Sequence, residues 1–84
     1  MKTVEIYTTP TCPYCRAAKQ LLAKKSVKYA EIDVSRDDTL RDKMTQRAHG
    51  SRSVPQIFIG GKHVGGCDDL HELDQAGQLD PLLA

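Results

Sequence analysis

Long hydrophobic runs, an excess of charge of one sign, tryptophan and an even set of cysteines are all missing from this 84-residue sequence. No apolar run approaches the roughly 18 residues of a membrane-spanning helix, which excludes such a helix. Lysine and arginine number 12 against 11 aspartate and glutamate, and this balance argues against a surface for nucleic acid or an anionic membrane. Three cysteines are too few, and odd in number, for a secreted disulfide framework.

Length and the first residues bear on domain organisation and location. Eighty-four residues lie below the usual range for two domains, so we expect a single domain over 1–84. Residues 1–5 enter a strand pattern at once and show no signal-peptide core. Together with the cysteine count, this predicts a cytoplasmic location. One core uses all the predicted apolar positions, which favours a monomer.

Hydrophobic periodicity predicts four strands and three helices. The strands are expected at 2–8, 27–34, 56–59 and 62–64, and the helices at 13–25, 36–48 and 68–77. Ser35 and Asp38 suggest a capping box for the second helix, and Gly60-Gly61 suggests a two-residue hairpin turn. The first two strands, which flank a helix, should be parallel with a right-handed crossover. This order predicts a thioredoxin-like α/β fold, a four-stranded mixed sheet with the three helices on both faces.

The segment Cys12-Pro13-Tyr14-Cys15 falls at the predicted strand-to-helix junction. Residues i and i+3 of a first helical turn are about 5–6 Å apart, a separation that a disulfide accepts. Cys12 should lie beside unpaired helix N–H groups and the positive end of the helix dipole, which favour the nucleophilic thiolate. Cys15 lies deeper in the turn and should be the resolving thiol. The pair therefore predicts thiol–disulfide exchange.

Three other interpretations of the cysteines compete. Zinc could use Cys12, Cys15 and Cys67 with a histidine (His49, His63 or His71), although the histidines lack the short spacing of finger modules. Inert buried cysteines are a second interpretation, but a helix start with Pro-Tyr between two of them is poor core design. A structural disulfide is the third, and a reducing compartment disfavours it.

The sequence resembles a glutaredoxin along essentially its whole length. Three motifs carry the resemblance, in order and at domain-compatible spacing: Cys12-Pro13-Tyr14-Cys15, Ser53-Val54-Pro55, and Gly65-Gly66-Cys67-Asp68-Asp69. The first is similar to the active site of dithiol glutaredoxins. Thioredoxins typically carry Gly-Pro between the cysteines and tryptophan before them, and this chain has no tryptophan.

The resemblance implies that the second and third motifs bind glutathione. Pro55 is then expected to be cis, and the backbone of Val54 to hold glutathione as an added strand. Ser53 occupies a position where threonine is commoner in the family, and it keeps the hydroxyl group. Gly66 and Cys67 precede a helix whose free N–H groups suit a carboxylate, while Asp68 would hold the γ-glutamyl ammonium. Capping of the helix by an aspartate is the alternative role, and the two are compatible.

Departures from the family pattern shift some roles. Many glutaredoxins carry lysine where this chain has Thr9, so we expect Arg52 to bind the glycyl carboxylate instead. An ordinary exposed arginine is the alternative for Arg52. Tyr14 is expected to form a partly exposed wall of the glutathione groove. Cys67 is expected to be a small packed residue, with reactivity left as a hypothesis.

The resemblance implies that Cys12 attacks glutathionylated proteins and protein disulfides, with glutathione as reducing co-substrate and no metal or tightly bound cofactor. Two rival functions remain. In one, two chains share an iron–sulfur cluster through Cys12 and two glutathiones, which Pro13 and Tyr14 disfavour. In the other, a flavoprotein thioredoxin reductase replaces glutathione as the reductant.

Overall fold

The computed structural model describes residues 2–84. Eight elements follow one another along the chain. They are β1 (Val4–Thr8), α1 (Pro13–Lys24), β2 (Ala30–Asp33), α2 (Asp38–Arg47), β3 (Gln56–Ile59), β4 (Lys62–Gly65), α3 (Cys67–Gln75) and α4 (Leu79–Leu83).

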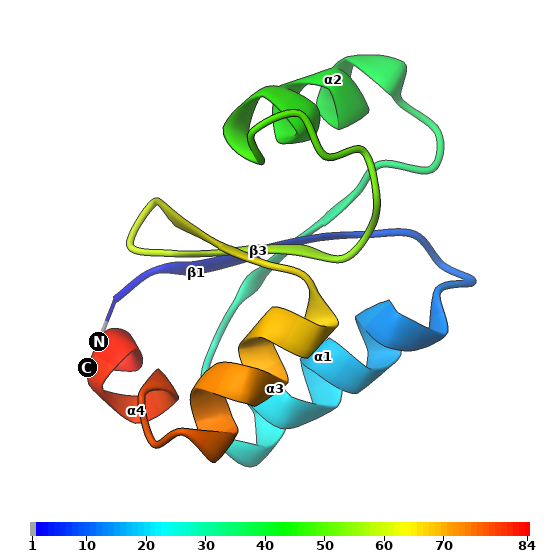
Figure 1. Cartoon of the computed structure of the whole chain (residues 1–84). Coiled ribbons are helices and arrows are strands. Elements are labelled where there is room, and N and C mark those ends of the chain that lie inside the picture. Colours follow the sequence, from blue (N-terminus) through cyan, green and yellow to red (C-terminus); the bar gives the residue numbers. More distant parts are fainter. Residues whose placement is uncertain (1) are drawn as a thin grey trace.

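The strands form one four-stranded sheet in the order β2-β1-β3-β4. β1 pairs with β2 in parallel and with β3 antiparallel, and β3 pairs with β4 antiparallel. Figure 1 shows α2 on one side of the sheet and α1, α3 and α4 on the other. The predicted thioredoxin-like mixed sheet with helices on both faces is therefore confirmed.

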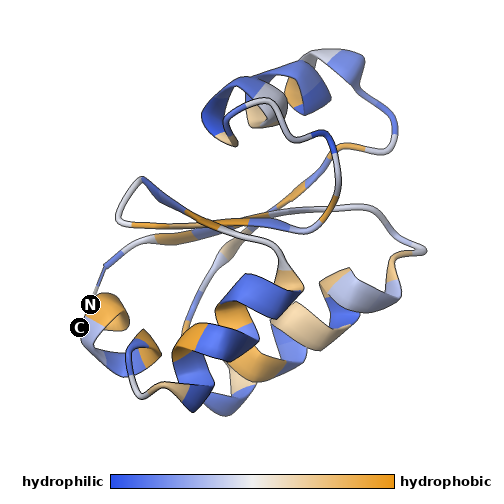
Figure 2. Cartoon of the chain, viewed as in Figure 1, coloured by the Kyte–Doolittle hydropathy of each residue, from blue (hydrophilic) through white to orange (hydrophobic). Residues whose placement is uncertain are grey.

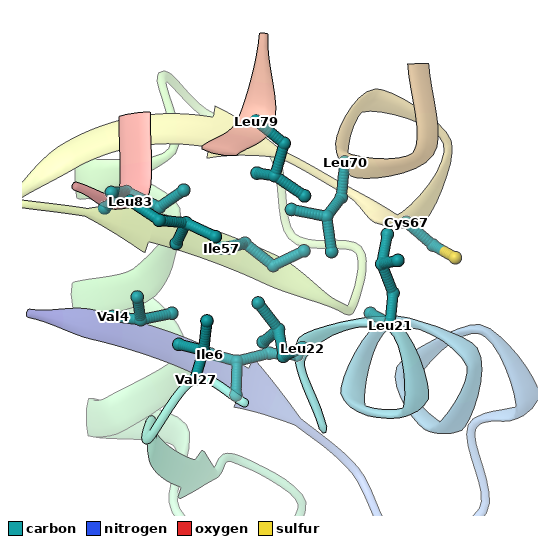
Figure 3. Packing of buried hydrophobic residues seen from close by; sticks show 12 residues of the cluster. Val4, Ile6, Leu21, Leu22, Val27, Ile57, Cys67, Leu70, Leu79 and Leu83 are labelled. Atoms are coloured by element: carbon teal, nitrogen blue, oxygen red, sulfur yellow. The ribbon is translucent and has the colours of Figure 1, made fainter. Parts of the chain in front are cut away.

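Each face of the sheet has its own hydrophobic cluster. Leu22, Ile57 and Leu70 lie at the centre of the larger cluster, between the sheet and helices α1, α3 and α4 (Figure 3). Met44 and Phe58 belong to the smaller cluster beneath α2. Figure 2 shows α2 coloured largely as hydrophilic, in keeping with the small apolar area it buries. Met44 and Leu70 are each fully buried in their clusters.

Arg47 joins α2 to the sheet by polar contacts. Its two terminal nitrogens donate to both carboxylate oxygens of Glu5 at 3.0 and 2.9 Å, and one of them also donates to Tyr7 Oη at 2.9 Å. The guanidinium carbon lies 4.1 Å from the ring centre of Phe58. These contacts hold α2 over the sheet where the apolar contact area is small.

The hairpin turn is as predicted, because Gly60 and Gly61 have φ angles of +60° and +81°, the left-handed backbone that such two-residue turns require. The capping box predicted for α2 is wrong. Asp37 is the N-cap, and its carboxylate accepts hydrogen bonds from the N–H groups of Thr39 and Leu40. Ser35 lies in the preceding turn, where its N–H donates to Asp33.

The second strand and the C-terminal segment also differ from the prediction. The second strand covers only Ala30–Asp33 instead of 27–34, because the N–H of Val27 closes the end of α1 on Leu22 O and leaves the ladder. A fourth helix, α4, was not predicted, since five residues are too few to show helical periodicity. Within residues 2–84, no helix is both long enough and apolar enough to span a membrane.

Candidate active site

The two cysteines of the Cys-x-x-Cys segment lie at the first turn of α1. Cys12 is the N-cap residue with extended backbone, and its Sγ accepts the backbone N–H of Cys15 at 3.1 Å. Pro13 occupies the first helical position, where its missing N–H removes no helical bond. The sulfur of Cys12 therefore sits where helix N–H groups stabilise negative charge.

Burial separates the two thiols. Cys12 is partly exposed, whereas Cys15 is 1% exposed on the inner side of α1. Burial, followed by the hydrogen bond to Cys12, raises the pKa of Cys15 to about 12. Both cysteines are free thiols. The arrangement suits an accessible nucleophile at Cys12 and a protected second thiol at Cys15.

The segment before β3 lies against Cys12. The thiol of Cys12 donates to the carbonyl oxygen of Val54 at 3.7 Å, although the two residues are 42 positions apart in the chain. The Val54–Pro55 peptide bond is cis, as expected. Within residues 2–84, the N–H of Val54 donates to no backbone carbonyl. An unpaired backbone N–H is therefore presented beside the nucleophile.

A groove of about 370 Å³ runs from this segment to the start of α3. Tyr14 forms one wall and is 64% exposed. The residues lining the groove are Tyr14, Ser51, Ser53, Val54, Pro55, Gln56, His63, Gly65, Gly66, Cys67, Asp68 and Asp69. The volume lies in the range of small-molecule sites, and the wall offers backbone, hydroxyl and carboxylate groups.

The two aspartates at the start of α3 have different roles. Asp69 caps the helix, because its Oδ2 accepts the N–H of Gly66 at 2.9 Å. Asp68 is exposed and lines the groove. A carboxylate is therefore available there for a cationic ligand group.

Cys67 is 7% exposed and packs at the margin of the larger cluster (Figure 3). Burial and the nearby Asp68 raise the pKa of Cys67. The ring Nδ1 of His71 lies 2.9 Å from Cys67 O and 3.4 Å from Cys67 Sγ. Because a carbonyl oxygen only accepts, Nδ1 carries the proton and is no base for this thiol.

The structure does not bring Arg52 into the groove. Its Nη1 donates to Asp42 Oδ1 at 2.9 Å, and its side chain is turned toward α2. Of the residues between 2 and 84, none that lines the groove is a lysine or an arginine. Within the same residues, no three His, Cys, Asp or Glu side chains are grouped so that they could hold a metal ion.

Comparison with known proteins agrees with this geometry. The glutaredoxin family model matches residues 4–64. This chain belongs to the glutaredoxin family. It is 52% identical to glutaredoxin 3 of Escherichia coli over 83 residues, which covers 99% of each protein. The chain is therefore a thiol–disulfide oxidoreductase by family.

Solved glutaredoxin structures share the fold. The solution structure of a glutaredoxin from Brucella melitensis superposes with a TM-score of 0.87 at 54% identity, covering 99% of this chain and 89% of that one. A crystal structure of a buckwheat glutaredoxin–glutathione complex gives a TM-score of 0.89 at 33% identity, covering 98% of this chain and 76% of that one.

Three groove residues lie outside the motifs that sequence reasoning assigned to the site. These are Ser51, Gln56 and His63. Only Gln56 left a signal, because a polar residue at the start of an apolar strand, here 3% exposed, needs partners. The others come from β4 and the loop after α2, and the fold alone brings them to this glutaredoxin groove.

Proposed function

We propose that this chain reduces glutathione mixed disulfides and protein disulfides, with Cys12 as nucleophile and glutathione as reductant. One observation carries the proposal. The accessible Cys12 sulfur, which accepts a helix N–H, is held against Val54, whose main chain borders a groove with a free carboxylate. The groove thus offers a site for a peptide whose own sulfur meets Cys12.

Glutathione matches the groups that the groove presents. The unpaired N–H of Val54 suits the main chain of an extended peptide. Asp68 would hold the γ-glutamyl ammonium, and the backbone of Gly66 and Cys67 would face the neighbouring carboxylate. Tyr14, Ser53 and Pro55 complete the walls. The related buckwheat protein has been crystallised with glutathione.

Arg52 is the cation we propose for the glycyl carboxylate, since Thr9 replaces the lysine. It would first have to release Asp42, and an exposed ion pair of this kind is worth only about 0–1 kcal/mol. Arg52→Ala should raise the KM for glutathione about threefold. Asp42→Ala, which frees the guanidinium, should leave the KM unchanged or lower it. An unchanged KM in Arg52→Ala would remove Arg52 from the site.

The reaction consists of two exchanges at sulfur. The Cys12 thiolate attacks the glutathione sulfur of a glutathionylated protein, the old S–S bond breaks, and the protein thiolate leaves. A second glutathione thiolate then attacks the glutathione sulfur of the mixed disulfide. Cys12 is regenerated, oxidised glutathione leaves, and glutathione supplies both electrons.

Protein disulfides require the second cysteine. Attack by Cys12 gives a mixed disulfide with the substrate, which Cys15 resolves to leave a Cys12–Cys15 disulfide for glutathione to reduce. The high pKa of Cys15 makes its thiolate scarce, so this step needs a proton acceptor, for which the departing substrate thiolate serves. The reducing glutathione pool that both routes use supports action in the cytoplasm.

Coupled turnover tests the proposal. NADPH oxidation is followed with glutathione, glutathione reductase and a glutathionylated peptide for wild type, Cys15→Ser and Cys12→Ser. Wild type and Cys15→Ser should turn over, because this route needs one thiol, and Cys12→Ser should be inactive. No turnover in wild type would refute glutathione as the reductant, and NADPH oxidation with thioredoxin reductase alone would identify the alternative.

A further inference from the structure

A chain of hydrogen bonds runs along part of the groove wall. His49 Nδ1 and His63 Nδ1 are 3.1 Å apart, and His63 Nε2 lies 2.7 Å from Gln56 Oε1. The Gln56 amide nitrogen is 3.0 Å from Ser51 Oγ, 3.0 Å from Ser53 O and 3.2 Å from Ser53 Oγ. Four of these five residues, all but His49, line the groove.

This series of hydrogen bonds determines which ring nitrogen of neutral His63 carries the proton. Ser53 O only accepts, so the Gln56 nitrogen must face it and Oε1 must face His63. Oε1 also only accepts, so His63 Nε2 carries a proton. The Nδ1 atom of neutral His63 is then an acceptor, and His49 Nδ1–H donates to it.

Gln56 depends on this donor. It is 3% exposed, and every fully buried side-chain nitrogen or oxygen within residues 2–84 has a partner. Without the imidazole, Oε1 would lose, in a buried place, the only side-chain donor that residues 2–84 give it. A buried acceptor left unpaired is costly, so the amide would turn or shift and release the serine segment.

The two facing Nδ1 atoms leave room for one proton between them. With one ring charged, the N–H···N bond persists in one direction or the other. With both rings charged, two N–H groups face each other at 3.1 Å and the rings must separate. His49 is exposed and only two residues before Ser51, so its displacement reaches the groove wall directly.

We propose that His63 is a positioning residue for the glutathione groove, acting through Gln56 on residues 51–53, and that double protonation of the His49–His63 pair loosens this wall. The inference rests on the proposed function, because it concerns the same groove. It adds the expectation that the affinity for glutathione falls in acid for a reason separate from thiolate chemistry.

The surroundings of His63 set the direction of its titration. Burial and, next, the charge of His49 lower the pKa of His63, while Asp69 at the start of α3 acts in the opposite sense. Beneath it on β3 lies the uncharged Phe58 ring, at 5.1 Å between ring centres. His63 is therefore neutral at pH 7, and its second ring nitrogen is protonated only at a lower pH than that of an ordinary histidine.

The test uses S-methylglutathione, whose capped sulfur removes thiol chemistry from the binding measurement. Its dissociation constant is measured by NMR titration at pH 7.0 and 5.5, where its own carboxyl groups stay ionised. His63→Leu removes the donor. His63→Gln keeps an amide N–H near the Nε2 position but cannot titrate. His49→Asn removes the facing ring and suits the left-handed backbone at His49, where φ is +58°.

At pH 7.0, His63→Leu should bind about three- to tenfold more weakly, with kcat changed less than twofold, and His63→Gln should match wild type. At pH 5.5, wild type should weaken about threefold, while His63→Gln and His49→Asn should not. Nitrogen-15 shifts of the wild-type imidazole should show the proton of His63 on Nε2 at pH 8.

The inference would be overturned, while the proposed function stands, if His63→Leu bound S-methylglutathione as tightly as wild type. It would also be overturned if wild type and His63→Gln lost equal affinity in acid, or if the proton of His63 were on Nδ1. A wild-type chain that neither binds S-methylglutathione nor turns over would refute both.

Discussion

Iodoacetamide added to the fully reduced chain at pH 7 should modify Cys12 long before Cys15. The two sulfurs are neighbours in one helical turn, yet they differ in exposure and in charge environment. Cys12 is partly exposed and accepts a helix N–H, whereas Cys15 is 1% exposed. Since only the thiolate reacts, the difference in environment becomes a difference in rate.

The magnitude follows from ionisation. With a pKa of about 12, about one Cys15 thiol in 10⁵ is ionised at pH 7. A thiol at the ordinary value of 9.0 would be ionised to about one part in 10². Compared with a thiol of ordinary pKa, ionisation alone should therefore slow the reaction of Cys15 with iodoacetamide about 1000-fold. Burial should slow this reaction further. Cys67, 7% exposed and also raised in pKa by burial, should react slowly as well.

The assay is an anaerobic time course read by intact mass and peptide mapping. One adduct should form on Cys12, with Cys15 and Cys67 unmodified until the chain is unfolded in guanidinium. Cys12→Ser should leave Cys15 slow, because burial is the largest cause of its raised pKa. Modification of Cys15 as fast as Cys12 in the folded chain would refute the reasoning.

Two further changes test the packing that holds the site. Arg47→Ala should lower the free energy of unfolding by about 1–2 kcal/mol at pH 7. Because Arg47 lowers the pKa of Glu5 below 4.5, this loss should be fully present above that pH and shrink as pH falls to 3, measured by urea denaturation. Gly65→Ala should destabilise more than Gly50→Ala in thermal melts, because both glycines have positive φ but only the Cβ at 65 meets the capping Asp69. Equal losses in the two glycine variants would contradict the contact at Asp69.

The parts of the fold that local chemistry determines could be predicted. A strand pattern ending before Cys12-Pro13 defined the junction, and Gly60-Gly61 defined the hairpin turn. The N-cap of α2 could not be predicted, because Ser35 and Asp37 both suit a cap. The carboxylate of Asp33 accepts the N–H of Ser35 and holds Ser35 in the turn before the helix. Asp37 is therefore the residue that caps α2.

The site divides in the same way. Residues within the three motifs were predicted to surround the groove, and all of the motif residues assigned to glutathione binding line it. Arg52, which was assigned from outside the motifs, does not. The pairing of Arg52 with Asp42 and the His63–Gln56 contact join different elements, so no local pattern could reveal them. Helix α4 escaped because its stability comes from burying Leu79 and Leu83.

The central claim is that Cys12 alone forms the mixed disulfide with glutathione. Cys15→Ser cannot close the internal disulfide, so incubation with oxidised glutathione should trap the intermediate. Intact mass and peptide mapping should show one glutathione, on Cys12, released by added free glutathione. An adduct on Cys67 instead, or none under conditions where wild type turns over, would contradict the account.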